Sequence, residues 1–144
     1  MSQGLIGSVK KKLRSGAGEF IGFTVGVVML MYFLSFFLGL VILQNAMNDM
    51  NYAAIQASRS TVVCSDMSEA TQKAQGIAEG ILSRNASISN PRVTIRYTAG
   101  SDEDWTRGSY IDVIVSGRVD TISPLVPENM CASETVMIEY YEDK

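Results

Sequence analysis

Few residues in this chain could take part in covalent or metal chemistry. The sequence contains no His, which excludes Ser-His and Cys-His nucleophile pairs and His-ligated metals. Its two cysteines, Cys64 and Cys131, lie far apart in the sequence. The acidic run at 102–104 lacks the alternating oxygen ligands and the Gly of an EF-hand loop. We therefore predict no catalytic site, no metal site and no cofactor, and we expect a protein that is not an enzyme.

The overall composition narrows the choice of partners. The chain of 144 residues corresponds to about one domain, and its net charge is -3. Proteins that bind phosphate backbones usually carry a basic surplus, so we expect no nucleic-acid partner. Charged residues make up 19% of the chain and apolar residues 47%. A soluble domain has about 25% charged residues, so part of this chain is expected to avoid water.

A long uncharged segment is the strongest signal in the sequence. The 24 residues from Phe20 to Leu43 carry no charge, and the wider interval between Glu19 and Asp49 holds 29 uncharged positions. As an α-helix the 24-residue core would reach about 36 Å, against about 30 Å of bilayer hydrocarbon. We predict that residues 20–43 form a transmembrane helix. The alternatives are a buried helix of a soluble protein and a cleavable secretory signal, whose apolar region spans only about 7 to 15 residues.

The charges that flank this segment predict its orientation. Four bases precede it, at Lys10, Lys11, Lys12 and Arg14. The first base after it is Arg59. Because the positively charged flank stays in the cytoplasm, we expect residues 1–19 to be a basic cytoplasmic leader and residues 44–144 to be an extracytoplasmic domain. The expected location is the cytoplasmic membrane, crossed once with the N-terminus inside.

Small residues recur in this segment at helical spacing. Gly18, Gly22 and Gly26 are four positions apart and share one helix face. Ser35 and Gly39 repeat the spacing on roughly the opposite side. Short side chains let another membrane helix approach closely, so we expect both faces to pack against neighbouring helices. The alternative is that Gly is simply more frequent in membrane helices than in soluble ones.

Beyond the span the pattern predicts two helical segments. Residues 44–63 contain no Gly or Pro, so the membrane helix should continue out of the bilayer. Asp66 and Glu69 have the spacing of a capping box and should begin a second helix. Apolar residues then recur with a period of 3.6, and the segment from Asn85 to Pro91 should end this helix.

After Pro91 the apolar period changes to two, which is typical of half-buried strands. The alternation predicts strands that begin at Arg92 and at Tyr110, with a bulge at Gly117, and a third strand over 134–141. Three antiparallel strands need a cover for their inner face, which the helices can supply. The predicted fold class is α+β, with an N-terminal transmembrane helix extended out of the membrane, a second helix and a small three-stranded antiparallel sheet.

Both cysteines fall in the expected extracytoplasmic part, where conditions favour oxidation. We expect a disulfide between Cys64 and Cys131. It would close a loop of about 68 residues and contribute about 4 kcal/mol of stability in the chain-entropy model. The alternative is two buried free thiols that pack as small hydrophobic groups.

The order of these features resembles a known family. The chain has a basic leader, then Gly16-Ala17-Gly18-Glu19-Phe20, a long apolar helix and a small α+β domain, with Pro124 and Pro127 ahead of the last strand. This arrangement resembles type IV pilin-like proteins, and most of all the TadE-like pseudopilins of tight-adherence pili and related secretion systems. The resemblance implies a subunit that packs through its apolar helix with like or related helices, with a prepilin peptidase and assembly machinery as further partners.

The resemblance also implies roles at the leader junction. Family members are cut after a Gly and carry a Glu at the fifth mature position, which makes Gly16 and Gly18 candidates for processing and Glu19 a candidate for subunit pairing. Cleavage after Gly16 would make Glu19 the third residue, whereas a fifth-position Glu needs a cut after Arg14. Both a processed and an unprocessed form are therefore retained. Physically, Glu19 either pairs with a cation of a neighbouring subunit or lies at the level of the lipid headgroups.

Two functions follow as hypotheses. The first is a pilin-like subunit that assembles through its N-terminal helix into a pilus or pseudopilus of a tight-adherence or type IV-like secretion system. The second is a single-pass membrane component of a transport or conjugation apparatus that does not polymerise and contributes an extracytoplasmic binding domain.

Overall fold

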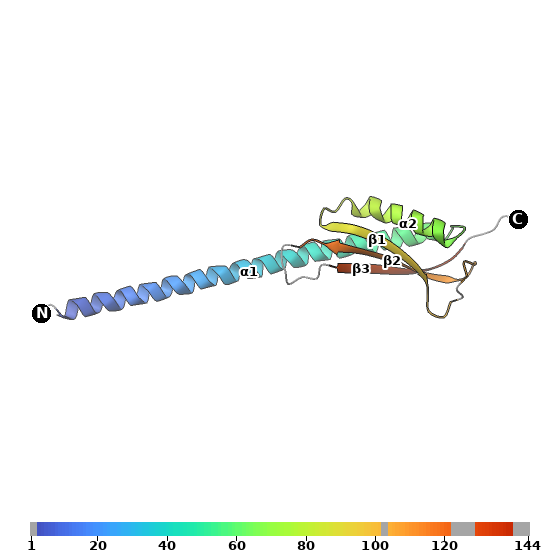
Figure 1. Ribbon diagram of the computed structural model, residues 1–144. Helices are drawn as coiled ribbons and strands as arrows, with labels where there is room; N and C mark the ends of the chain where they lie inside the picture. Colours follow the sequence, from blue (N-terminus) through green and yellow to red (C-terminus); the bar gives the residue numbers. More distant parts are fainter. Residues whose placement is uncertain (1–2, 102–103, 122–128, 140–144) are drawn as a thin grey trace.

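A long helix projects from a small domain in which two helices cover one face of a sheet (Figure 1). The computed structural model describes residues 3–101, 104–121 and 129–139, with side chains from residue 18 onward. The elements are α1 (Gln3–Thr61), α2 (Met67–Leu82), β1 (Ile88–Tyr97), β2 (Tyr110–Val119) and β3 (Asn129–Met137). The strands are antiparallel in the order β1-β2-β3. The predicted α+β class, with its long helix, second helix and three strands, is confirmed.

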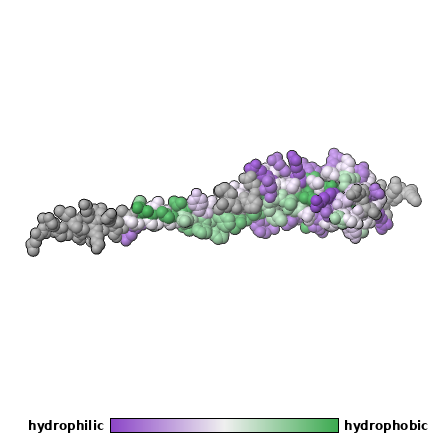
Figure 2. Space-filling model, turned by 60° about the horizontal axis from the view of Figure 1, so that its bottom comes forward, coloured by the Kyte–Doolittle hydropathy of each residue, from purple (hydrophilic) through white to green (hydrophobic). Residues whose placement is uncertain are grey.

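Two parts of α1 differ: residues 18–41, the exposed half, are apolar and mostly exposed, and residues 46–61 are packed into the domain. Over Gly18–Thr61 the helix is long and apolar enough to span a membrane, and only 6% of its most apolar window is buried. The green surface along the projecting helix in Figure 2 shows this exposure. From Ala46 onward one stripe of α1 is buried, formed by Ala46, Met50, Ala53, Ala54 and Ala57. The helix thus changes from a uniformly apolar rod to an amphipathic one without a break.

The start of α2 follows the predicted capping box closely. Asp66 is the N-cap, and its Oδ1 accepts a hydrogen bond of 2.7 Å from the backbone N–H of Glu69. The Glu69 carboxylate reaches back to Ser65, whose backbone N–H and hydroxyl donate to it at 2.9 and 2.7 Å. These bonds lower the pKa of Glu69 below its ordinary value. The apolar stripe of α2 is almost entirely alanine, at Ala70, Ala74, Ala78 and Leu82.

The sheet buries one face against the helices and leaves the other in solvent. Ile111, Val113, Val115 and Val119 of β2 point inward and are fully buried. Strand β1 begins at Ile88, earlier than predicted, and runs through Pro91. Proline is tolerated there because β1 is an edge strand and its register shifts between Ser89 and Arg92. The positive φ of Asn90, 52°, belongs to this irregular segment.

Strand β3 also differs from its prediction in position. It covers Asn129–Met137 instead of 134–141. Its inward positions begin with half-buried Met130 and the small Ala132, which form too weak an apolar alternation for sequence analysis to detect. Past β3, the N–H of Glu139 donates to the carbonyl of Val62 at 2.8 Å and joins the end of the sheet to the end of α1. Residues 140–141, and Pro124 and Pro127, lie outside the described residues.

The bulge predicted at Gly117 is confirmed in position, and its extra residue belongs to β1. Ser89 pairs with Arg118 and Arg92 with Ser116, so two residues of β1, Asn90 and Pro91, lie opposite Gly117 alone, whereas the pairing of Gly117 with Met130 of β3 is regular. A Cβ at position 117 would lie 2.9 Å from the Cε of Met50 and 3.2 Å from the Cγ2 of Ile88. A side chain at this position would therefore require the end of the Met50 side chain and Ile88 to move.

We expect Gly117→Val to destabilise the domain by about 1 to 3 kcal/mol, because a buried Met50 has little space into which its methyl group can move. Met50→Ala creates this space, so the double variant should lose less stability than the sum of the two single variants. Thermal and urea unfolding of the full chain in detergent micelles, followed by the fluorescence of Trp105, would measure both effects. Strict additivity would show that the two residues do not compete for the same space.

Candidate functional site

Three surfaces of the described chain are candidates for function: the exposed half of α1, the outer face of the sheet and the sheet edges. Within the described ranges, no group of three or more Cys, Asp and Glu side chains is placed to hold a metal ion.

The glycine face of α1 is open to its surroundings. A Cβ built at Gly18, Gly22 or Gly26 would meet no atom within 4 Å, so no packing inside this chain requires glycine there. The large side chains between them are exposed, for example Phe23 at 71%. The second pair of small residues lies in a different environment, because Ser35 is half-buried and Gly39 is buried within the chain. Of these five small residues of α1, the three glycines alone form a fully open face.

The leader junction contains Gly16 and Glu19, and both lie within the continuous helix α1. Glu19 is exposed at the start of the residues whose side chains are described. Among those side chains, no cation lies within ion-pair distance of its carboxylate. The structure of this single chain brings no partner to Glu19, so any pairing of this carboxylate involves something outside the described part.

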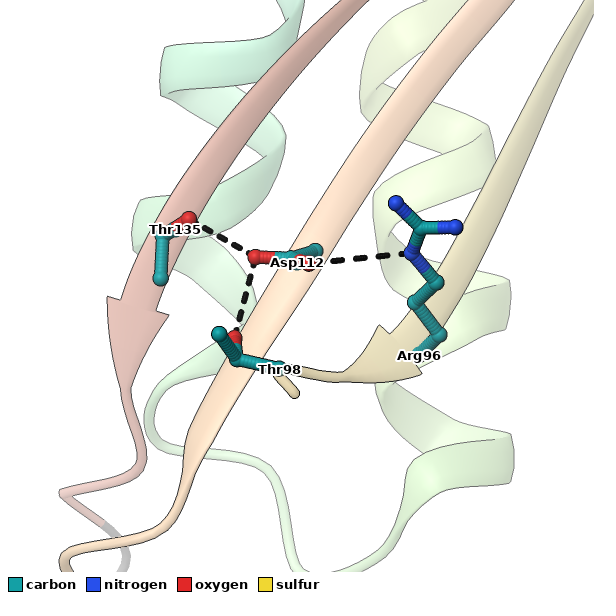
Figure 3. A network of polar contacts seen from close by, with 4 residues as sticks. All are labelled: Arg96, Thr98, Asp112 and Thr135. Carbon is teal, nitrogen blue, oxygen red and sulfur yellow. Dashed lines mark hydrogen bonds and ion pairs between the residues drawn. The ribbon is translucent and has the colours of Figure 1, made fainter. Parts of the chain in front are cut away.

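A polar network crosses all three strands on the outer face of the sheet (Figure 3). At its centre is Asp112 of β2, whose Oδ1 accepts hydrogen bonds from Thr135 Oγ1 of β3 at 2.7 Å and from Thr98 Oγ1 at 2.9 Å. The Nε of Arg96, on β1, lies 3.6 Å from the Asp112 Oδ2. The hydrogen bond from Thr135 is the main cause of a lowered pKa of Asp112, helped by Thr98 and Arg96.

This network joins the three strands of the sheet. The two hydroxyl groups donate to Asp112, so its carboxylate acts as an acceptor that joins β1, β2 and β3 across one row of the sheet. Sequence analysis did not single out Asp112. The available signal was its outward position in the alternation of β2, but the strand register needed to pair it with Thr135 is a tertiary property.

The predicted disulfide between Cys64 and Cys131 is not formed, and both thiols are free. Cys64 is buried between the end of α1 and the start of α2, and this burial raises the pKa of its thiol. Cys131 is exposed on the outer face of β3, next to the inward Ala132. Cys64 lies two residues after Val62, whose carbonyl accepts the hydrogen bond from the N–H of Glu139. Glu139 is eight residues beyond Cys131, or roughly 26 Å along an extended chain at about 3.3 Å per residue. A disulfide requires the two Cα atoms to be within about 7 Å, and this separation excludes it.

Contacts outside the predicted set fix α1 to the domain. The indole N–H of Trp105 donates to the carbonyl of Cys64 at 2.9 Å, just after the C-terminus of α1. Nearer the exposed half of the helix, the Nδ2 of Asn85 donates to the Asp49 carboxylate at 2.6 Å. Both contacts join residues far apart in the sequence, so they have no local signature. They hold the domain at a fixed position along the helix.

Comparison of the chain with protein-family models, curated proteins and solved structures found no match. A functional assignment therefore depends on the surfaces described above. The strongest of these are the exposed apolar helix and its open glycine face.

The lowered pKa of Asp112 predicts a pH dependence of stability. A carboxyl group whose pKa is depressed by folding stabilises the native state above its ordinary pKa of 3.8, and this contribution is lost as the pH falls through the folded-state pKa. Asp112→Asn should cost about 1 kcal/mol at pH 7 and progressively less below about pH 4. Unfolding followed by Trp105 fluorescence at several pH values would measure this difference.

The matched control is Asp120→Asn, which removes an exposed carboxylate 3.4 Å from Arg118 near the end of β2. It should cost less at neutral pH, because exposed ion pairs contribute little. An equal cost for the two variants at every pH would contradict a special role for Asp112.

Proposed function

We propose that this protein is a pilin-like subunit, similar to the TadE-like pseudopilins, that is anchored in the cytoplasmic membrane and assembles through the exposed half of α1. The observation that carries the proposal is the continuity of α1. One unbroken helix joins an exposed apolar half to a half that forms the core of a small α+β domain. Such a helix can pack with like helices in a membrane or filament and hold each domain at a constant position relative to it.

The exposure of the apolar half supports the membrane assignment. A core helix of a soluble protein would be mostly covered by its own chain, whereas only 6% of the apolar window of α1 is buried. Burying this surface in lipid removes a large apolar area from water, which is the main driving force for insertion. A signal sequence would also be apolar, but α1 continues without interruption to Thr61, where it is part of the domain core.

The open glycine face supports assembly through the helix. In lipid, helices associate through close van der Waals packing, because apolar side chains gain nothing by leaving the similarly apolar lipid. Gly18, Gly22 and Gly26 form a surface on which a second helix can approach the α1 backbone. Glu19 lies beside this face and could neutralise a basic group of the adjacent subunit or lie at the headgroup level.

A second function is kept because of the arrangement of small residues. Gly39 is buried by its own chain and Ser35 is half-buried, so the described helix offers one open small-residue face and not two. A single face is sufficient for a dimer or for contact with one partner helix. This favours, as the alternative, a non-polymerising membrane component of a transport or conjugation apparatus whose domain binds another molecule.

The exposed thiol of Cys131 provides a test of the proposed orientation. The four bases before the span should keep the N-terminus in the cytoplasm and place the domain outside. A membrane-impermeant maleimide added to cells with their outer layers opened should then modify Cys131 and spare the buried Cys64. Cys131→Ser is the control and should abolish labelling. Labelling of the wild type that appears only after the membrane is lysed would show the opposite orientation.

Assembly can be tested by adding bulk to the open face. Gly22→Leu should still insert, because Leu is more apolar than Gly, but it should reduce helix–helix crosslinking in membranes about tenfold or more through loss of close packing. Glu19→Ala should reduce crosslinking if the carboxylate pairs with a neighbour and have little effect if it lies among headgroups. Recovery of sheared surface filaments would be measured in parallel at equal expression.

The control is Thr24→Leu, which places the same side chain, Leu, about 200° around the helix from Gly22. It should leave crosslinking near the wild-type level. If Gly22→Leu reduces crosslinking but the wild type itself yields no filament, the result would favour the non-polymerising alternative. Wild-type crosslinking and filament yield in both Gly22→Leu and Glu19→Ala would contradict assembly through this face.

A further inference from the structure

The two edges of the sheet differ in what covers their backbone groups. At the β1 edge, Gln75 of α2 takes the place of a neighbouring strand. Its Nε2 donates to the carbonyl of Pro91 at 3.0 Å, and its Oε1 accepts from the N–H of Val93 at 2.7 Å. Together with the irregular segment at Pro91, this side chain occupies the outward groups in the middle of β1 and prevents another strand from pairing there.

The β3 edge has no such cover among the described residues. Just past β3, the N–H of Ile138 donates to the carbonyl of Ser109 at 2.9 Å, and the C=O of Ile138 accepts from the N–H of Gly108 at 3.0 Å. Both backbone groups of Ile138 therefore point toward the β2 side. Because these directions alternate along a strand, the backbone groups of Cys131, Ser133 and Thr135 point away from β2. Within the described chain, none of these outward groups is hydrogen-bonded. They form a row of donors and acceptors along an exposed strand.

Of the usual protections against edge pairing, β3 has one, the charge of Glu134 on the side that faces α1. The strand contains no Pro and no Lys, and it pairs with β2 over nine consecutive positions without a register shift. The only charged residue in it is Glu134. Natural proteins generally block a long regular edge with a charge, a bulge or a cover, and one edge of this same sheet is blocked. With one charge and no bulge or cover among the described residues, the β3 edge is suited to pairing with an added strand that neutralises Glu134.

Antiparallel pairing with a second copy of the chain is a poor fit for this edge if, as proposed above, α1 anchors every copy in one membrane. Met130 lies beside Gly117, which contacts Met50, and Glu139 bonds to Val62. Strand β3 therefore runs in the same direction as α1. Antiparallel pairing of two β3 edges would make the two membrane helices point in opposite directions. A separate extended polypeptide has no such restriction.

The side chains on the α1 side of β3 define which polypeptide fits. Met130 and Val136 are half-buried and pack against the core, so an added strand could cover their exposed remainder with apolar side chains. Between them, Glu134 is exposed and has no cation partner in the described chain. A basic residue directly opposite Glu134 would form a cross-strand ion pair.

We propose that the β3 edge binds an extended segment of another protein by strand addition, and that this segment alternates apolar and polar residues with one Lys or Arg placed opposite Glu134. Main-chain hydrogen bonds to residues 131–135 provide the affinity, and the apolar and basic side chains select the register. The antiparallel direction is favoured because its hydrogen bonds are slightly more stable.

The probe is a fluorescent nine-residue peptide with Thr at odd positions, Val at even positions and a Lys at the fourth. In antiparallel register this Lys lies opposite Glu134 and the central Thr opposite Ser133. Fluorescence anisotropy would measure its binding to the full-length chain in nanodiscs. N-methylation of the central Thr removes a donor to β3 and should weaken binding about tenfold or more, while N-methylation of the adjacent Val, whose N–H points away, should have little effect.

Matched protein variants test the same contact from the other side. Ser133→Pro removes the outward N–H without removing a bond to β2, and it should weaken binding about tenfold, whereas Ser133→Val keeps this N–H and should bind like the wild type. Glu134→Lys should shift preference by about twofold to fivefold toward a peptide with Glu at the fourth position. If Ser133→Pro fails to fold, the two N-methylated peptides decide the question on the wild type.

Absence of saturable binding by the Lys peptide, or equal binding of the two N-methylated peptides, would overturn the proposal. It would also be wrong if the peptide does not bind and Ser133→Pro instead abolishes self-association of the chain, because the occupant would then be a second copy. These readouts do not depend on filament formation, so their failure and that of the proposed assembly function are distinguishable.

Discussion

The close packing of the second half of α1 against α2 and the sheet is the contact on which the rest of the structure depends. The buried stripe of α1 is rich in alanine, as is the facing stripe of α2. These short side chains let the two helices approach each other and cover a sheet of only three strands. Where a longer side chain, Met50, points at the sheet, Gly117 supplies the space.

Because α1 is continuous, this packing also fixes the position of the domain relative to the exposed half of the helix. The domain cannot slide or rotate relative to the apolar half without breaking the contacts of Asp49 with Asn85 and of Val62 with Glu139. A neighbour bound to the glycine face would therefore fix the position of the domain as well. The proposed assembly through α1 and the proposed binding at β3 would then take place on one rigid body.

The sheet holds β3 firmly on one side and leaves its other side open. Asp112 joins the three strands on the outer face through Thr98, Thr135 and Arg96, which keeps β3 in register although its far edge is unpaired. Gln75 closes the opposite edge. A strand that is firmly held on one side and open on the other is a stable template for an added strand. The polar outer face of the sheet leaves this open edge exposed to solvent.

The sequence by itself determined the features that depend on local chemistry and periodicity. These are the apolar helix from residue 20, its continuation past residue 43, the Asp66 cap, and the change from helix to strands near Pro91. Only the tertiary structure decided the rest. The separation of Cys64 from Cys131, the space at Gly117, the burial of Gly39 and the open edge of β3 all depend on which distant segments meet and in which register. A one-residue change in register reverses every side chain of a strand, and no local pattern records this choice between distant partners.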